Sequence, residues 1–342
     1  MSFSPNTTST TTTTTRPEAL EYARPGISSS GRSIARQLWS SAGMLIVFIA
    51  VCIGASIFIP GFLSWPNMKG LGLSVATVGM ISCTMLFCLA SGDFDLSVGS
   101  IVAMAGMLAA VVTNATGSVV LGVASALVAG TLVGVCNGFV IAQLGINALI
   151  ATLATMQIAR GMAFMISSTS VGITNASFYS LGITSFIGVP TPIWLTLACF
   201  IFFGLLLRQT TFGRNTLAIG GNSEAARLAG IAVTRTKIVI FAMQGLIAAF
   251  AGCVLAARMT SGQPNTAIGL ELQVISACVL GGVSLTGGIG NMGGVIIGVL
   301  IMGIVQNAMN LKGLDFRYQY IVNGSILLAA VLLDKLQQRG AR

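Results

Sequence analysis

The sequence predicts an all-α, polytopic membrane protein, and three observations lead to that fold class. Hydrophobic residues make up 54% of the 342 residues and charged residues only 7%, whereas about 25% of residues are charged in soluble domains. A soluble chain of this length needs many charges to cover its surface. The apolar residues form stretches of about 20 residues, the length that a helix needs to cross a bilayer. The basic residues gather in a few of the segments between those stretches.

The N-terminal 38 residues differ in kind from the rest. They contain a threonine run at 7–15, broken only by Ser9, and three prolines, Pro5, Pro17 and Pro25. Such a segment cannot bury enough apolar surface to become ordered, so residues 1–38 are predicted to be a disordered tail. The apolar run 42–59 that follows is longer than a typical signal-peptide core, and no cleavage site stands out. It is predicted to be an uncleaved membrane helix.

About ten membrane helices are predicted along the chain. The eighth is the weakest, because it is short and contains Gly281, Gly282 and Gly287. We expect it to be bent or to span incompletely, so counts of eight or nine stay open. The predicted spans are 41–60, 69–90, 99–115, 119–143, 147–168, 192–208, 236–257, 271–288, 291–311 and 318–334.

The basic residues predict the orientation. Twelve of the 17 Lys and Arg lie in the N-terminal tail, around the loop 209–235 and at the C-terminus, and loops rich in Lys and Arg stay in the cytoplasm. We therefore expect a transmembrane domain at 39–336, a cytoplasmic loop at 209–235, and cytoplasmic tails at 1–38 and 337–342. The net charge of +9 is explained by insertion into lipid, and nucleic acid is not an expected partner because the bases are sparse.

Matches at an offset of 170 residues indicate an internal repeat. The second to fifth helices would correspond to the seventh to tenth and run in the opposite direction, an inverted arrangement that is typical of transporters. A composition artefact is the alternative interpretation. The matching pairs include Cys83 with Cys253, Ser91 with Ser261, Gly92 with Gly262, Gly99 with Gly269, and Asn137 with Asn307.

The segment 91–100 is the first functional candidate. It places Asp93 and Asp95, two of only eight acids, between two apolar helices and near Gly99. Asp95 or Ser97 could simply cap the next helix. Alternatively, the segment is a broken or re-entrant element near a transport path, with Asp93 or Asp95 acting in gating. Because uncompensated charge at membrane depth is costly, either acid should be capped, paired or hydrated.

The loop 209–235 is the second candidate. Ser223 can cap a short helix that starts at Glu224, and Gly230 can end it. A short, capped helix between two membrane spans is rigid and protrudes, which suits a contact that pushes on a partner. A surface loop that merely carries positive charge is the alternative.

Polar residues inside the apolar helices form the third candidate group. Arg160 lies about 20 Å along its predicted helix at the usual rise, with Gln157 nearly on the same face. Such an arginine is a functional candidate, and a structural pair or snorkelling is the equal alternative. Asn137 and Asn307 could line a polar path, although hydrogen bonds between helices are favoured for both.

Catalytic and metal-binding roles are not expected. The chain has no His, no nucleophile–base arrangement is visible, and there is no phosphate-binding GxxxxGK[ST] loop. All seven Cys lie inside apolar stretches and are expected to be small core residues. We therefore expect no enzyme activity, no metal and no cofactor on this chain.

Four motifs resemble the branched-chain/ribose-type permease family of bacterial ABC importers, over about residues 40–335. The stretch 92–100, Gly-Asp-Phe-Asp-Leu-Ser-Val-Gly-Ser, is similar to the signature of its sugar branch. Residues 211–222 and 224–230 resemble its coupling loop, and 281–288 its late glycine motif. Stretches at 85–98, 146–157, 258–264 and 306–311 are most similar to the L-arabinose permeases of that family.

The resemblance implies a transport subunit of the bacterial inner membrane with both termini in the cytoplasm. A separate ATPase would hold Mg-ATP and bind the inside loop, a periplasmic sugar-binding protein would deliver the cargo, and a second copy of the permease would complete a homodimer within membrane lipid. The cargo would be a monosaccharide, L-arabinose first, with ribose, galactose or xylose as alternatives. A stand-alone secondary transporter or channel is the rival class.

These considerations define two sets of candidate residues. The ATPase-coupling set is Arg214, Asn222, Glu224, Ala225, Ala226, Arg227 and Gly230. The translocation or gating set is Asp93, Asp95, Ser97, Gly99, Asn137, Gln157, Arg160 and Asn307.

Overall fold

The computed structural model describes residues 1–2 and 29–339 and divides the chain into two units, Met1–Trp39 and Ser40–Arg342. Residues 29–39 of the first unit are the beginning of helix α1 (Ser29–Phe58). The helix therefore starts before the predicted residue 41, and good helix formers such as Ala35, Arg36 and Leu38 explain the extension. Most of the tail for which disorder is predicted, and residues 340–342, lie outside the described residues.

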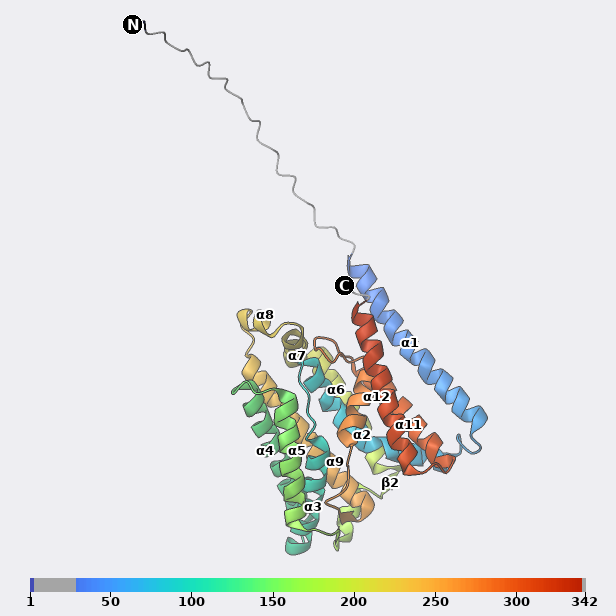
Figure 1. The fold of residues 1–342 in the computed structure, drawn as a ribbon. Coiled ribbons are helices and arrows are strands. Elements are labelled where there is room, and N and C mark those ends of the chain that lie inside the picture. The colour runs from blue at the N-terminus through green and yellow to red at the C-terminus, as the bar shows by residue number, and fades with distance from the viewer. Residues whose placement is uncertain (3–28, 340–342) are drawn as a thin grey trace. The chain divides into compact units, whose positions relative to one another are not determined.

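The second unit is built almost entirely of helices (Figure 1). In the described part of the chain, four two-residue strands form two small antiparallel pairs, β1 with β4 and β2 with β3. After α1 the elements are α2 (Trp65–Ala90), α3 (Val98–Thr116), α4 (Val119–Ala142), α5 (Ala148–Ile166), β1 (Val171–Gly172), η1 (Ala176–Leu181), β2 (Ser185–Phe186), β3 (Val189–Pro190), α6 (Thr191–Gln209), α7 (Thr211–Gly221), α8 (Ser223–Leu228), α9 (Val233–Met259), β4 (Ser261–Gly262), α10 (Leu270–Leu280), α11 (Met292–Leu311) and α12 (Phe316–Arg339).

These helices confirm an all-α, polytopic membrane protein. Among the described residues, seven helices are long and apolar enough to cross a membrane: α2 to α6, α9 and α11. Nine of the ten predicted spans coincide with a helix in the described part of the chain, and the eighth does so only over its first part. The weak eighth span is the 11-residue α10, which is followed by turns in which Gly282, Gly287 and Gly288 adopt positive φ.

Glycines bring the backbones of α4 and α9 into contact along one face. A Cβ added at Gly130 would lie 2.6 Å from Gly245 O, and one added at Gly138 would lie 2.7 Å from Ile238 Cα. No real side chain fits these gaps. Close approach of this kind is how membrane helices gain packing energy when lipid supplies no hydrophobic drive between them.

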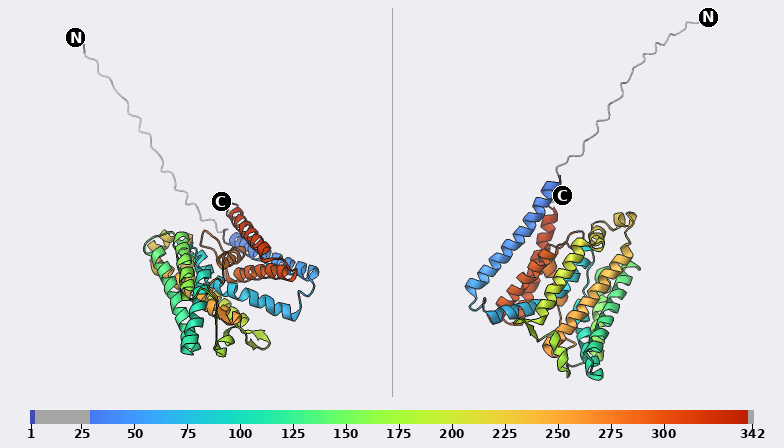
Figure 2. Two further views of the ribbon diagram at one scale, coloured as in Figure 1. Left: turned by 60° about the horizontal axis from the view of Figure 1, so that its bottom comes forward. Right: turned by 180° about the vertical axis from the view of Figure 1, so that it is seen from behind.

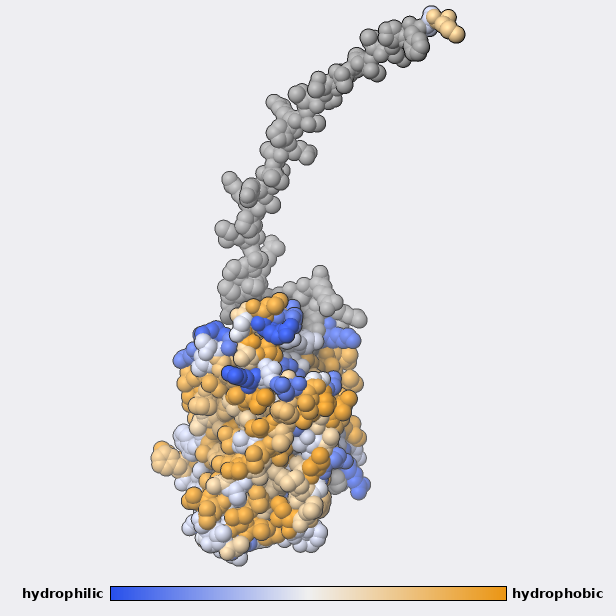
Figure 3. Space-filling view, turned by 90° about the vertical axis from the view of Figure 1, so that its left-hand side faces the viewer, coloured by the Kyte–Doolittle hydropathy of each residue, from blue (hydrophilic) through white to orange (hydrophobic). Residues whose placement is uncertain are grey.

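The opposite face of α4 carries large apolar side chains at helical spacing. They are exposed on the isolated chain, as expected for groups that contact lipid: Leu121, Val128, Leu132, Val135 and Phe139. Figure 3 shows the same pattern on the visible side of the unit, where apolar residues cover most of the surface and hydrophilic residues gather near one end.

The contacts between α2 and α9 support the predicted inversion of the repeat. Arg258, near the end of α9, donates to Leu73 O near the start of α2 at 2.6 Å. Lys237, near the start of α9, forms an ion pair of 2.8 Å with Asp93, just beyond the end of α2. The two helices therefore run in opposite directions. Helix α10 departs from the repeat, since its counterpart α3 has 19 residues.

The arrangement places α2 at the centre. Helices α3 to α5 gather with α9 on one side of the second unit and α11 and α12 lie on the other (Figures 1 and 2). The residues of α2 from Ala76 to Ala90 are all buried. The short helix α8 and the C-terminal end of α12 lie at the same end of the unit (Figure 1). We refer to this end as the α8 end.

We predict that Gly138→Leu destabilises the protein by about 1–3 kcal/mol or more, because the added side chain must separate α4 from α9. Thermal unfolding in detergent measures the effect. Gly324→Leu is the matched control, since nothing lies within 4 Å of a Cβ at Gly324. Equal losses of stability in the two variants would contradict the packing argument.

Candidate functional site

Two breaks in the helices occur at repeat-related positions. Residues 91–97 separate α2 from α3, and residues 260–269 separate α9 from α10. The breaks meet where α3 begins: a Cβ added at Gly99 would lie 2.6 Å from Ala267 O, and the Glu271 side chain is in contact there as well. The chain is therefore non-helical at the segment singled out from the sequence, and a second non-helical segment lies against it.

A chain of hydrogen bonds holds the first break. Ser97 donates to Asp95 Oδ1 from its backbone N at 2.9 Å and from its Oγ at 2.6 Å. Asn137 Nδ2 on α4 donates to Ser97 Oγ at 3.0 Å, and Thr155 Oγ1 on α5 donates to Asn137 Oδ1 at 2.7 Å. Every donor thus points toward the buried carboxylate of Asp95.

The expected capping roles at this break are only partly present. Ser97 occupies the N-cap position of α3, but its side chain makes no capping bond to that helix. It is instead held by Asp95, which satisfies the backbone N of Ser97. The Ser97 hydroxyl donates to Asp95 and accepts from the Asn137 side-chain amide. This buried hydroxyl therefore has a partner in both roles, as buried polar groups generally do.

Asp93 joins the first break to the second repeat. Its Oδ2 lies 2.8 Å from Lys237 Nζ, and the two side chains are only 9% and 18% exposed. A buried charge without a partner would be strongly unfavourable, so the pair fixes the start of α9 beside the break. A pocket of about 460 Å³ lies next to the pair and is lined by Gly92, Asp93, Phe94, Ile141, residues 145–149 and Lys237.

Arg160 holds the second break. Its Nη1 donates to Pro264 O at 2.7 Å and to Thr266 O at 2.8 Å. The guanidinium of this half-buried arginine is thus bound to backbone carbonyls, which agrees with a structural role. Gln157, predicted on nearly the same face, is exposed on α5.

Among the described residues, Asn307 hydrogen-bonds Asn67 and no residue of either break. It exchanges amide hydrogen bonds with Asn67 at 3.0 and 2.8 Å, which tie α11 to α2. Asn137 and Asn307 thus both bond between helices, as favoured from the sequence, but only Asn137 contacts a break.

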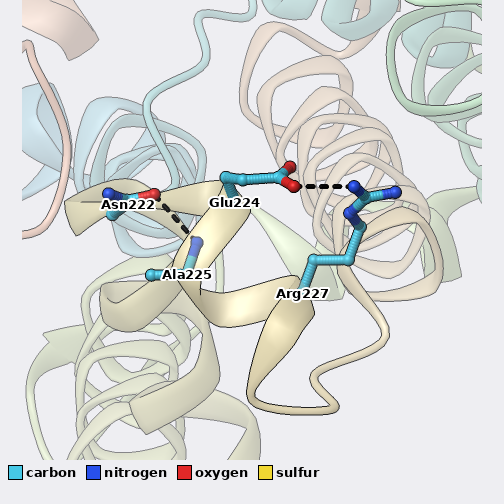
Figure 4. A network of polar contacts seen from close by, with 4 residues as sticks. All are labelled: Asn222, Glu224, Ala225 and Arg227. Atoms are coloured by element: carbon cyan, nitrogen blue, oxygen red, sulfur yellow. Dashed lines mark hydrogen bonds and ion pairs between the residues drawn. The ribbon is translucent and has the colours of Figure 1, made fainter.

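Two consecutive helices form the predicted coupling loop. Asn222 ends α7 and caps α8, since its Oδ1 accepts from Ala225 N at 2.9 Å (Figure 4). The prediction that Ser223 is the cap is therefore wrong by one residue. Ser223 has entered the helix because Asn222, in an extended conformation, already supplies a strong capping oxygen.

Gly230 ends α8 as predicted. It adopts φ +85°, its N donates to Arg227 O, and Ile231 N donates to Ala226 O, each at 3.0 Å. This is the pattern of a Schellman motif, in which a left-handed residue reverses the chain and satisfies the last carbonyls. Six residues are thus fixed at both ends.

The exposed surface of α8 carries both charge and an apolar side chain. Arg227 bonds Glu224 at 2.7 Å (Figure 4), and this hydrogen bond, with the charge attraction, raises the pKa of Arg227. Leu228 is 80% exposed. Ala225 is exposed, Ala226 is buried beneath the helix, and Arg214 is exposed on α7.

Sequence reasoning missed Lys237, Thr155 and Asn67 as partners of candidate residues. In the sequence, Lys237 counts only among the bases around the loop 209–235. A signal for it existed, because a buried acid requires a counter-charge and few bases are available. Thr155 and Asn67 carried no such signal, since hydroxyls and amides are common in membrane helices.

The family model for the branched-chain amino acid transport system / permease component matches residues 67–331. The L-arabinose transport system permease protein AraH of Escherichia coli (strain K12) is 59% identical over 307 residues, which cover 90% of this chain and 94% of that protein.

Two further relatives extend the comparison. The L-arabinose ABC transporter permease protein AraH of Azospirillum brasilense is 51% identical over 90% of this chain and 91% of its own. The ribose import permease protein RbsC of Bacillus subtilis (strain 168) is 39% identical over 88% of this chain and 94% of its own. No solved structure gives a significant match.

We predict that Asn137→Ala destabilises the protein by about 1–3 kcal/mol, because the Ser97 and Thr155 hydroxyls lose a buried partner. A double-mutant cycle with Thr155→Ala, read by thermal unfolding in detergent, measures the coupling. Strictly additive losses would show that the two side chains do not interact.

We predict that Asn222→Ala weakens α8, since loss of an N-cap costs about 0.5–2 kcal/mol. Hydrogen exchange of the α8 amides reads the change locally. Ser223→Ala serves as control and is expected to leave the exchange rates nearly unchanged. A larger effect from Ser223→Ala would show that Ser223, and not Asn222, caps α8.

Proposed function

Because this chain belongs to the family of branched-chain amino acid transport system / permease components, we propose that it is the membrane-spanning subunit of an ABC importer. Helix α8 is the observation that carries this proposal. It is fixed at both ends, by Asn222 and Gly230, and it exposes Glu224, Arg227 and Leu228. A rigid helix of this kind can receive force from a partner that binds nucleotide.

The proposed cargo is L-arabinose. Support comes from the relatives that are 59% and 51% identical, whose names specify L-arabinose. Ribose fits less well, because the relative named for ribose is only 39% identical. Neither galactose nor xylose is favoured by a feature of this chain.

The proposed assembly contains two copies of this chain, two ATPase subunits that hold Mg-ATP, and a periplasmic sugar-binding protein. The α8 end then faces the cytoplasm of a bacterial cell, with the chain in the inner membrane and both chain termini on the cytoplasmic side. The Lys- and Arg-rich sequences around 209–235 support this orientation through the positive-inside rule.

The two breaks are the proposed gating elements. Irregular backbone at membrane depth occurs where it is buried in protein or lines a polar path. The first break contains Asp93, Asp95 and Ser97, and Gly99 lies in the first turn of α3. Asn137 hydrogen-bonds the first break and Arg160 the second. Asn307 and Gln157 hydrogen-bond neither break in the described part of the chain, so less supports a gating role for them.

Reconstitution tests the function directly. Proteoliposomes that contain this chain, the ATPase and the sugar-binding protein should accumulate radiolabelled L-arabinose when Mg-ATP is supplied, and should prefer it to ribose, galactose and xylose. Liposomes with this chain alone should show no flux. Ion-driven uptake by the chain alone would establish the rival secondary transporter.

We predict that Leu228→Asp lowers co-purification of the ATPase with this chain, since a desolvated apolar anchor contributes about 1–3 kcal/mol to an interface. Pull-down from detergent measures the complex. Ile183→Asp is the matched control, because Ile183 is an exposed apolar residue in the segment between α5 and α6. Unchanged recovery with Leu228→Asp would place the ATPase elsewhere.

A further inference from the structure

Three segments far apart in the sequence meet in backbone contact at the α8 end. They are the end of α2, the end of α7 and the loop that follows α10. Gly288 N donates to Ala90 O, the otherwise free carbonyl at the end of α2, at 2.9 Å. Gly220, near the end of α7, lies directly against both partners of this bond, and a Cβ there would overlap Ala90 O.

Further glycines complete the contact. A Cβ added at Gly287 would lie 2.8 Å from Gly220 O and 3.0 Å from Gly92 Cα. Gly287 and Gly288 have φ of +86° and +78°, a conformation that residues with a Cβ rarely adopt. We call the set Ala90, Gly92, Gly220, Gly287 and Gly288 the glycine joint.

The joint is stiff for a physical reason. Side chains between two elements can change rotamer and absorb a movement, whereas backbones in direct contact leave nothing to rearrange. Close-packed protein is poorly compressible and transmits strain. A second contact holds the beginning of α7 on α2. It joins Phe212 to Phe87, whose ring centroids are 5.9 Å apart.

Helix α8 is firmly attached to one side of this joint. Asn222 lies two residues beyond Gly220, its N donates to Ala218 O of α7 at 3.1 Å, and its side chain caps α8. A displacement of α8 therefore moves the end of α7 with it.

On the side of the glycine joint away from α8, the joint continues into the first break and into the loop after α10. Gly92 is followed directly by Asp93, which pairs with Lys237. Gly287 and Gly288 lie in the loop that follows α10, and α10 begins at the second break. The joint thus connects α8 to both chain breaks.

We propose that the glycine joint transmits the displacement of α8 to the end of α2 and the end of α10, so that the two breaks respond together. Gly220 is the positioning residue at its centre. This inference rests on the proposed function, because it names the mechanical path by which an ATPase bound at α8 controls the gating elements.

Gly220→Ala tests the path in the reconstituted transporter. The methyl group separates α7 from Ala90 and Gly288, and we expect L-arabinose uptake to fall by about tenfold or more. ATP hydrolysis and ATPase binding should change by less than about twofold, since the exposed residues of α8 and its cap at Asn222 keep their identity. Gly221→Ala is the matched control, because nothing lies within 4 Å of a Cβ at Gly221. Uptake by Gly220→Ala equal to that of the control would overturn the proposal.

Hydrogen exchange of the wild-type complex gives a second test that does not depend on how a variant folds. Binding of a non-hydrolysable ATP analogue should change exchange in 223–230, 91–97 and 281–288 together. A change at 223–230 with none at 91–97 would contradict transmission through the joint.

The two tests also separate this inference from the proposed function. If the wild-type chain with ATPase and binding protein shows no ATP-dependent uptake, the function itself is wrong. If wild type and Gly221→Ala transport L-arabinose and Gly220→Ala does so equally, only the joint is wrong.

Discussion

Backbone that leaves a helix within a membrane must find hydrogen-bond partners inside the protein, because lipid offers none. This constraint governs the two breaks, 91–97 and 260–269. At the first, Asp95 satisfies the backbone N of Ser97. At the second, Arg160 satisfies the carbonyls of Pro264 and Thr266. These side chains replace part of the backbone hydrogen bonds that a helix would have made.

Helix α5 supplies side chains to the hydrogen bonds of both breaks, so a movement of this helix would affect both. Thr155 completes the chain of hydrogen bonds that reaches Ser97, and Arg160, little more than one turn later, binds the second break. A rotation or shift of α5 would therefore disturb both breaks. Since α5 is a single rigid element, the partners of the two breaks cannot move independently.

The sequence predicted the helices well, because lipid imposes a simple rule of length and polarity. The glycines of the span 271–288 predict a weak helix, and the structure has the 11-residue α10 followed by turns at that place. The start of α1 at Ser29 was missed because helix-forming residues continue beyond the apolar run.

The site was predictable only in part. Asp93, Asp95 and Ser97 stood out because acids are rare in this chain, but their partners could not be found from periodicity. Asn137 lies 40 residues from Ser97, and the rotation of α4 that brings them together depends on the packing of Gly130 and Gly138 against α9. Arg160 binds backbone carbonyls. Every residue has a backbone carbonyl, so the partners of Arg160 cannot be identified from residue type.

The glycines of this protein serve two distinct purposes, and the difference bears on how force could pass through it. Along α4 and α9 they let two straight helices lie close, so their role is packing energy. At Gly220 and Gly287 they remove the side chains that would otherwise cushion the contact between α7, α2 and the loop after α10. A permease driven from α8 needs such a contact, since any compliant layer there would absorb the movement before it reached Asp93.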